Sequence, residues 1–228
     1  MSRMFSQVTR TWNPVVGCPY LCRYCWARRL AQTRLKHMYK DFTKPKFYPE
    51  RLKRIPKNGF VFVCDMADLF ADDVPGEWIT SVLEAIHSSG SRATFMFLTK
   101  NPRRYMEFLD LFTGNMILGA TVESQYVPNY SRYSRAPDPL SRLYAMEDLS
   151  SYDLRLFLSI EPIFDFDLVA FQNWIIMINP EMIFIGYDNY NHNLPEPQED
   201  KTLELIKNLE YLGFKVYRKT LRKAWYEV

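Results

Sequence analysis

Three of the four cysteines lie close together near the N-terminus, as Cys18, Cys22 and Cys25. Their C-x3-C-x2-C spacing lets one loop curve three thiolates around a common centre, as zinc and iron–sulfur sites require. Gly17 and a nearby proline favour the tight turns of such a loop, and neighbouring arginines favour the thiolate form. The sequence therefore predicts a metal-binding loop at residues 17–26. Three protein ligands would leave one iron of a four-iron cluster open to a further ligand.

The chain also contains residues that could close a four-ligand site. Cys64 or His37 could complete a structural zinc site, and a closed four-cysteine cluster would need Cys64. However, Cys64 lies in an apolar run, where a buried thiol is the ordinary expectation, and His37 lies in a cationic segment typical of a surface. The usual C-x2-C-x2-C-x3-C run of a closed cluster is absent from the sequence. An open three-cysteine site is the favoured interpretation, with the closed site as its alternative.

The elements that position this loop are predicted by hydrophobic patterns. Short apolar runs predict buried strands at about 6–12, 60–64, 94–98, 116–122, 156–160 and 182–185. Helical segments are expected at about 24–36, 76–89, 102–112, 139–149, 167–178 and 199–212. Alternating strands and helices predict an α/β fold with a parallel sheet and right-handed crossovers. Six such units are too few for a complete eight-unit barrel, which leaves an open six-unit barrel or a doubly wound sheet.

Polar residues follow the C-terminal ends of five of the expected strands. Ligands bind at this edge of parallel α/β sheets. An acid after a strand is often only a helix N-cap, but its recurrence at five strands favours a shared pocket. The residues at these ends are Asp65, Asp68, Thr99, Lys100, Asn101, Glu123, Ser124, Glu161, Gly186, Asp188 and Asn189.

The composition predicts one globular domain over residues 1–228, long enough to bury a sizeable core. No apolar run approaches the roughly 20 residues of a membrane-spanning helix, and the first residues lack the apolar region of a secretory signal. Without an export signal, four cysteines bind metal or stay reduced more often than they form disulfides. We therefore expect a cytosolic (cytoplasmic) protein with no membrane partner.

The net charge of +3 conceals an uneven layout, because residues 1–58 hold 14 Lys and Arg but only two acids. The densest part is a basic insertion at about 41–58, and a second basic cluster lies at 215–223. Basic stretches with interleaved aromatics can follow a phosphate backbone and stack bases. The alternative is a solvated face that offsets the acidic remainder. The expected contacts to nucleic acid or a nucleotide are Lys44, Lys46, Arg51, Lys53, Arg54 and Lys57.

The cysteine spacing, with Tyr24 before the third cysteine, resembles the motif of radical S-adenosylmethionine (radical SAM) enzymes. The segments TWNPVVGC and YCWA further resemble a poorly characterised phage and prokaryotic three-cysteine family related to that superfamily. The resemblance extends from about Thr11 to the C-terminal VYRKTLRK. Its later segments are DMADLF at 65–70, LTKNPRR at 98–104, GATVES at 119–124 and LSIEPI at 158–163.

The resemblance implies a partial (βα)6 barrel of the radical SAM type with parallel strands. Cys18, Cys22 and Cys25 would hold a single [4Fe-4S] cluster whose open iron binds S-adenosylmethionine. An electron from an external donor would then cleave S-adenosylmethionine to a 5′-deoxyadenosyl radical. That radical would abstract hydrogen from a substrate that the sequence does not identify.

The rest of the pocket is assigned by position along the strands. Acids after the second expected strand would face the methionyl ammonium, although this chain has Cys-Asp-Met-Ala-Asp where many family members have Gly-Gly-Glu. Residues after the third and fourth strands would bind the carboxylate and ribose, and backbone near Tyr24 and Gly186 the adenine. The expected cofactor-binding residues are Tyr24, Asp65, Asp68, Thr99, Lys100, Glu123, Ser124 and Gly186. Candidates for contact with substrate or hydrogen-atom donation are Glu161, Tyr187 and Asn189.

Two classes of function therefore remain in view. The first is a radical SAM enzyme, with nucleic acid or a nucleotide as its suggested substrate. The second is a non-catalytic iron–sulfur or zinc module that binds nucleic acid or a protein partner. The second requires four protein ligands, so the role of Cys64 separates the two.

Overall fold

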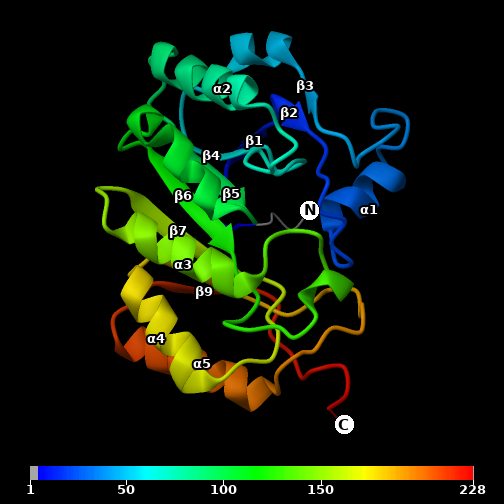
Figure 1. Ribbon diagram of the computed structural model, residues 1–228, viewed down its shortest axis with the longest axis vertical. Coiled ribbons are helices and arrows are strands. Elements are labelled where there is room, and N and C mark those ends of the chain that lie inside the picture. Colours follow the sequence, from blue (N-terminus) through cyan, green and yellow to red (C-terminus); the bar gives the residue numbers. More distant parts are fainter. Residues whose placement is uncertain (1–4, 228) are drawn as a thin grey trace.

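Seven parallel strands form one sheet, in the order β1-β4-β5-β6-β7-β8-β9, in the computed structural model, which describes residues 5–227. Every neighbouring pair is parallel, and the strand order follows the chain. The sheet is curled rather than flat (Figure 1). Its strands are β1 (Arg10–Trp12), β4 (Phe60–Val63), β5 (Thr94–Thr99), β6 (Met116–Thr121), β7 (Arg155–Ile160), β8 (Met182–Ile185) and β9 (Val216–Arg218).

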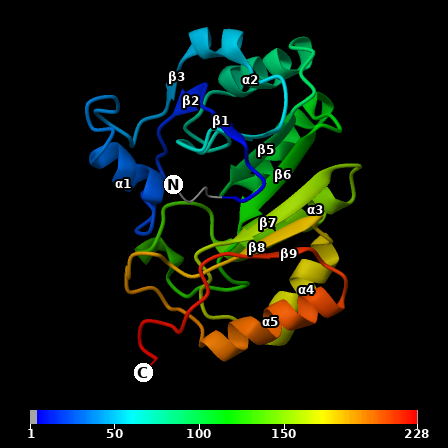
Figure 2. The same cartoon turned by 180° about the vertical axis from the view of Figure 1, so that it is seen from behind.

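Helices connect consecutive strands and cover one face of the sheet, as both views show (Figures 1 and 2). The core between them and the sheet is built from the apolar faces of the helices, which is why each crossover packs back onto the strands. The covering elements are α2 (Gly76–Ser88), η2 (Pro102–Leu111), α3 (Pro139–Ser150), α4 (Leu168–Ile178) and α5 (Glu199–Tyr211).

The opposite, concave face of the sheet holds a second apolar cluster. Phe5 and Val8, from the segment before β1, fill it together with side chains from β4 to β8. The ring centroids of Phe5 and Phe184 are 4.5 Å apart. Gly119 leaves space for the ring of Phe157, which a Cβ at that position would overlap. Both faces of the strands are therefore buried, as their continuous apolar runs predict.

Several elements differ from those expected from sequence. The segment expected as a helix at 102–112 is a 3₁₀ helix with non-helical angles at Phe108. The first helix, α1 (Trp26–Gln32), is shorter than the expected 24–36, and β1 is shorter than the expected strand at 6–12. Three further strands were not predicted: β9, and an antiparallel pair of β2 (Val15–Val16) and β3 (Lys46–Phe47). Short strands of two or three residues carry too little pattern to be recognised.

The remaining helical elements are two short 3₁₀ turns, η1 (Pro49–Arg54) and η3 (Tyr130–Arg132). Within the described part of the chain, no helix is both long and apolar enough to cross a bilayer. The predicted architecture, an α/β fold with a partly closed barrel of parallel strands, is thus confirmed, with one more strand than the six expected.

Candidate functional site

The cysteine loop follows β1 and β2 in the chain and passes the residues after β4. The amide of Gly17 donates to the carbonyl of Met66 at 2.9 Å, and Gly17 bridges in parallel to Ala67. Gly17 has φ +105°, and a Cβ there would lie 2.5 Å from the carbonyl oxygen of Lys44. Only glycine suits both the angle and the close approach. This residue therefore fixes where the cysteine loop begins.

All three loop cysteines are free thiols. Cys22 is buried, and its Sγ lies 3.1 Å from the hydroxyl of Ser134. Cys25 is the N-cap of α1, where its Sγ accepts from the amide of Arg28 at 3.3 Å. Contacts to the sulfurs of Cys22 and Cys25 thus help to hold the loop in place.

The thiols influence one another electrostatically. Burial raises the pKa of Cys18, and the nearby Asp68, Cys22 and Cys25 raise it further. Burial also raises the pKa of Cys25, to which Cys22 again adds. Between residues 5 and 227, no group of three or more His, Cys, Asp or Glu side chains is already gathered at metal-binding distance. Three cysteines on one loop, which affect one another's pKa, nevertheless match the residue types of a three-cysteine cluster site.

Cys64 lies outside the cysteine loop in the sequence. It lies directly after β4 and is 2% exposed. Burial raises its pKa to about 12, and the main charges acting on it are Asp65, Asp68 and Arg51, not the loop thiols. This environment matches the buried thiol expected from sequence.

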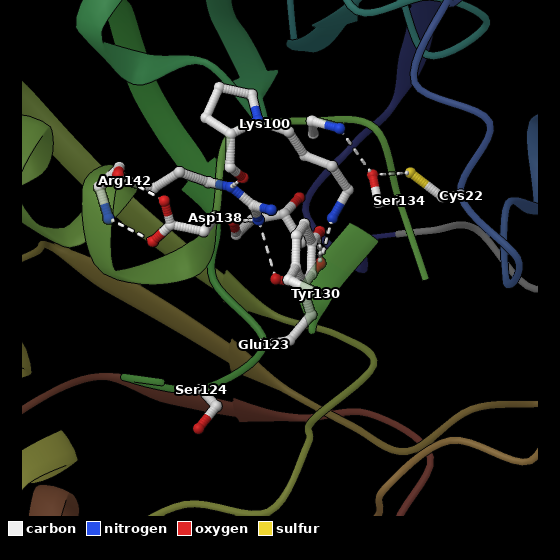
Figure 3. A network of polar contacts seen from close by, with 12 residues as sticks. Cys22, Lys100, Glu123, Ser124, Tyr130, Ser134, Asp138 and Arg142 are labelled. Carbon is white, nitrogen blue, oxygen red and sulfur yellow. Dashed lines mark hydrogen bonds and ion pairs between the residues drawn. The ribbon is translucent and has the colours of Figure 1, made fainter. Parts of the chain in front are cut away.

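A buried polar network lies beside the cysteine loop and is centred on Glu123 (Figure 3). Lys100 and the hydroxyl of Tyr24 both donate to its Oε1. The hydroxyl of Tyr130 donates to the same oxygen at 3.0 Å, and Arg142 Nη1 donates to Oε2 at 2.8 Å. Four elements thus converge on one carboxylate: the cysteine loop, the end of β5, η3 and α3.

The network carries one more positive than negative charge. Burial alone would raise the pKa of Glu123, but Arg142 and Lys100 lower it to about 2. Burial alone would lower the pKa of Lys100, but Glu123 and Tyr130 together raise it. Both cations and the carboxylate are therefore ionised at neutral pH. Among the described residues, Nη2 of Arg142 is buried without a hydrogen-bond partner.

A second group joins the ends of β4 and β5. Asp68 accepts from the hydroxyl of Thr99 at 2.6 Å and from the amide of Lys100 at 2.7 Å. It also accepts from the amide of Phe70 at 3.1 Å. Asp65 accepts from the side-chain amide of Asn13 at 2.5 Å. Burial raises the pKa of both carboxyl groups.

The structure therefore brings together Tyr24, Asp68, Thr99, Lys100 and Glu123 beside the cysteines, but not every predicted residue. Ser124 points away from the network (Figure 3), and its hydroxyl donates to the carbonyl of Asp165 at 2.7 Å.

Two of the three candidates for substrate contact also lie outside the group of residues gathered beside the cysteines. Tyr187 is fully buried, with its hydroxyl 2.7 Å from that of Thr202 and donating to the carbonyl of Pro197. Asn189 is exposed and accepts from Thr220 at 2.7 Å. The third candidate, Glu161, follows β7 directly, and its carboxylate lies 3.8 Å from Lys219 Nζ.

Three residues of the site were not predicted from sequence: Tyr130, Ser134 and Arg142. Tyr130 and Ser134 lie in a loop without a recognisable pattern. Arg142 did carry a signal, because it occupies a position of α3 whose neighbours one turn away, Pro139 and Met146, are buried. An arginine on the apolar side of a helix requires a buried acid.

Comparisons with known proteins agree with this fold. The family described as "Protein of unknown function (DUF5131)" matches residues 4–178. No curated protein matches the sequence.

Among solved structures, a spore photoproduct lyase variant with bound AdoMet and dinucleoside spore photoproduct matches with a TM-score of 0.65 and 12% identity. The match covers 93% of this chain and 76% of that chain. Streptococcus suis SuiB bound to S-adenosylmethionine matches with a TM-score of 0.57 and 8% identity, over 94% of this chain and 51% of that one. The curled half-barrel is the fold of these proteins, so the predicted radical SAM type of barrel is confirmed.

Proposed function

Because the chain belongs to the DUF5131 family, whose description names no activity, we propose a function from its own site: a radical SAM enzyme that acts on nucleic acid or a nucleotide. The observation that supports the proposal is the placement of Cys18, Cys22 and Cys25 as free thiols on one loop that follows the first strand of a parallel half-barrel. Proteins with this fold bind S-adenosylmethionine in two structures.

In this proposal the three cysteines hold a [4Fe-4S] cluster. When bound, the cluster supplies the electron that splits S-adenosylmethionine and so starts hydrogen abstraction from the substrate. The chain's own residues bind and orient S-adenosylmethionine. Asp68 keeps lone-pair capacity beyond its three hydrogen bonds and can face an ammonium group. Lys100 can face a carboxylate.

Glu123 takes a different role from the predicted contact with ribose. Its two oxygens already accept from four partners inside the chain. It therefore acts by holding Lys100 and Tyr24 in place beside the cysteine loop. The buried network also excludes water from that side of the site, which protects reactive intermediates.

The distribution of ion pairs supports a nucleic-acid partner at the N-terminal basic region. Among the described residues of 23–57, only Lys44 has a carboxylate within ion-pair distance, Asp41 at 3.9 Å. Lys46, Lys53 and Arg54 are exposed. Unpaired exposed cations on one surface are the electrostatic footprint of a phosphate backbone.

Not every expected contact is equally available. The guanidinium of Arg51 lies 4.0 Å from the ring of Tyr48 and donates to the carbonyl of Asn13 at 2.7 Å. Lys57 donates to the carbonyl of Ser89 at 2.5 Å. These two residues help to hold the segment in shape, and the outward cations are left to contact phosphate.

The second basic cluster, at 215–223, is largely neutralised. Arg218 pairs with Glu210 at 2.8 Å, and Arg222 pairs with Glu196 at 2.6 Å. Lys219 faces Glu161. The proposed phosphate contacts therefore lie in the N-terminal region and not in this cluster.

Anaerobic reconstitution with iron and sulfide tests the enzyme proposal. We expect the reconstituted cluster to change its EPR signal when S-adenosylmethionine is added, and dithionite to yield 5′-deoxyadenosine. Cys22→Ala should abolish both, whereas the matched variant Cys64→Ala should keep both. Loss of the cluster in Cys64→Ala would instead establish a closed four-cysteine module and refute the open site.

Charge-reversing substitutions in the basic region test whether it binds nucleic acid. Lys53→Glu with Arg54→Glu should weaken binding of a single-stranded oligonucleotide and reduce the dependence of log Kd on log salt concentration, since fewer counterions are released. Lys207→Glu, an exposed lysine of α5, is the control and should change neither. An unchanged salt slope in the double variant would refute the proposed surface.

A further inference from the structure

Two residues that follow β7 and β9, Glu161 and Lys219, form a polar group whose side chains have no role in the cofactor site proposed above. The last residues of β7, β8 and β9 pair with one another across the sheet. Glu161, Gly186 and Lys219 come next along these three strands. Gly186 has no side chain, and a Cβ there would lie 2.7 Å from Cβ of Lys219. The missing side chain lets Glu161 and Lys219 meet across the strand that separates them.

These side chains lie on the concave side of the sheet. Residues two apart on a strand share a face, which places Ser159 below Glu161. On the neighbouring strands the rings of Phe184 and Tyr217 stack at 4.9 Å. Lys219 Nζ lies 5.5 Å from the ring centroid of Phe5, which packs against Phe184. The polar group therefore sits above an aromatic floor.

Two oxygens of this group are buried without a hydrogen bond within the described residues: Oγ of Ser159 and Oε2 of Glu161. Ser159 is 1% exposed. Lys219 Nζ, at 3.8 Å from Oε2, is close enough to attract the carboxylate but too far to hydrogen-bond with it. Buried polar atoms are almost always satisfied, so atoms that are not require an explanation.

We propose that Ser159, Glu161 and Lys219 form a subsite for the edge of one unpaired nucleobase. This rests on the nucleic-acid partner proposed above. The carboxylate of Glu161 would accept from a ring or exocyclic N–H, and Lys219 would donate to the adjacent carbonyl or ring nitrogen. The Ser159 hydroxyl can donate or accept. Every base presents a donor beside an acceptor on its Watson–Crick edge, and the edge is free only in a single strand or an extruded nucleotide.

Charge and solvent access agree with this assignment. The side chains of Glu161 and Lys219 are 16% and 17% exposed, so a ligand can reach these two from the open edge of the barrel. Ser159 is 1% exposed and lies beneath them, so a base would reach its hydroxyl only by displacing these two side chains. Burial raises the pKa of Glu161, and Lys219 opposes that rise. Glu161 and Lys219 thus keep an acceptor and a donor side by side. A phosphate group at the same place would be repelled by the carboxylate of Glu161.

Binding of two DNA octamers to the reconstituted protein tests the inference. One octamer is wholly abasic, and the other carries a single central thymine on the same backbone. We expect the single base to tighten Kd about tenfold, since a bidentate base contact discriminates at that level or above. Lys219→Met and Glu161→Leu should bring both octamers to the same Kd, and Lys207→Met is the control that should keep the difference.

Ser159→Ala separates recognition from structure. Its hydroxyl has no partner among the described residues, so its removal should leave the urea midpoint unchanged or raised. The gain from the single base should nevertheless fall. If Ser159 had only a structural role, its removal would not leave the urea midpoint unchanged or raised and also reduce the gain from the single base.

The response of the cluster EPR signal to S-adenosylmethionine is recorded on the same samples. Equal affinity of the wild type for both octamers, with that response intact, would overturn this inference and leave the proposed enzyme standing. Loss of that response in the Ser159, Glu161 and Lys219 variants, with base discrimination retained, would assign these residues to the cofactor and also overturn it.

Discussion

Neutralising Glu123 should strongly destabilise the fold, because the Glu123→Gln variant leaves Lys100 and Arg142 buried without a counter-charge. Glutamine has nearly the size of the protonated acid, so the free energy that ionisation of Glu123 adds to folding sets the scale of the loss. Its pKa falls from an ordinary value of 4.5 to about 2. At 1.36 kcal/mol per pKa unit, this corresponds to about 3 kcal/mol at pH 7. Breaking buried ion pairs costs about 3–5 kcal/mol in other proteins.

The stabilisation should depend on pH with a definite sign. A carboxyl group with a lowered pKa in the folded state stabilises folding above its ordinary pKa and loses that effect as the pH falls through its folded value. The difference between wild type and Glu123→Gln should therefore shrink from about 3 kcal/mol at pH 7 to about 1.5 kcal/mol at pH 3.

Urea unfolding followed by circular dichroism measures this difference. With a slope of about 2–3 kcal/mol per molar urea, the midpoint at pH 7 should fall by about 1 M. Glu181→Gln is the matched control, because Glu181 pairs with Arg155 at the surface, where a pair contributes about 1 kcal/mol or less. A Glu123→Gln loss no larger than that of the control, or one that does not change with pH, would refute the reasoning.

Three further substitutions test local features of the fold. Gly119→Ala should lower stability by about 1–3 kcal/mol, because its Cβ would overlap the ring of Phe157; an unchanged urea midpoint would contradict this packing. Gly17→Ala should reduce the iron content after reconstitution, since the backbone angle and the carbonyl of Lys44 both oppose a Cβ; full iron incorporation would show that the loop does not need this turn. Cys64→Ser should lower stability by about 1–3 kcal/mol, because it places a hydroxyl in a buried thiol site, and thermal unfolding of the metal-free protein against Cys64→Ala measures the difference.

Much of the fold could be predicted from the sequence because both faces of most strands are buried. The strands β5 and β7 contain the apolar runs FMFL and LFL, and a run of that kind between helical segments indicates a parallel strand. The segment around Phe108 could not be predicted in the same way. Its hydrophobic spacing suits an α-helix, and only the backbone geometry shows the 3₁₀ helix and its kink.

The site could be predicted where its residues lie in one short segment or directly after a strand, as Asp68, Thr99 and Glu123 do. Cys18, Cys22 and Cys25 lie together in sequence, so spacing alone marks them. The partners of Glu123 are spread from Tyr24 to Arg142. Contacts between residues so far apart depend on how strands and helices are arranged, and a single sequence carries no record of the pairing.

The Glu123 network also explains how the barrel and the cysteine loop stabilise each other. Tyr24 lies between the second and third loop cysteines, and its hydroxyl reaches the same carboxylate oxygen as Lys100 from the end of β5. Cys22 is near enough to influence the pKa of both Tyr24 and Lys100. The network has a surplus positive charge, and the loop supplies three groups that become negative when they lose protons. A negatively charged group at the cysteines would therefore add to the counter-charges that Glu123 and Asp68 give to the buried cations, and its binding should stabilise the same contacts that close the loop onto the sheet.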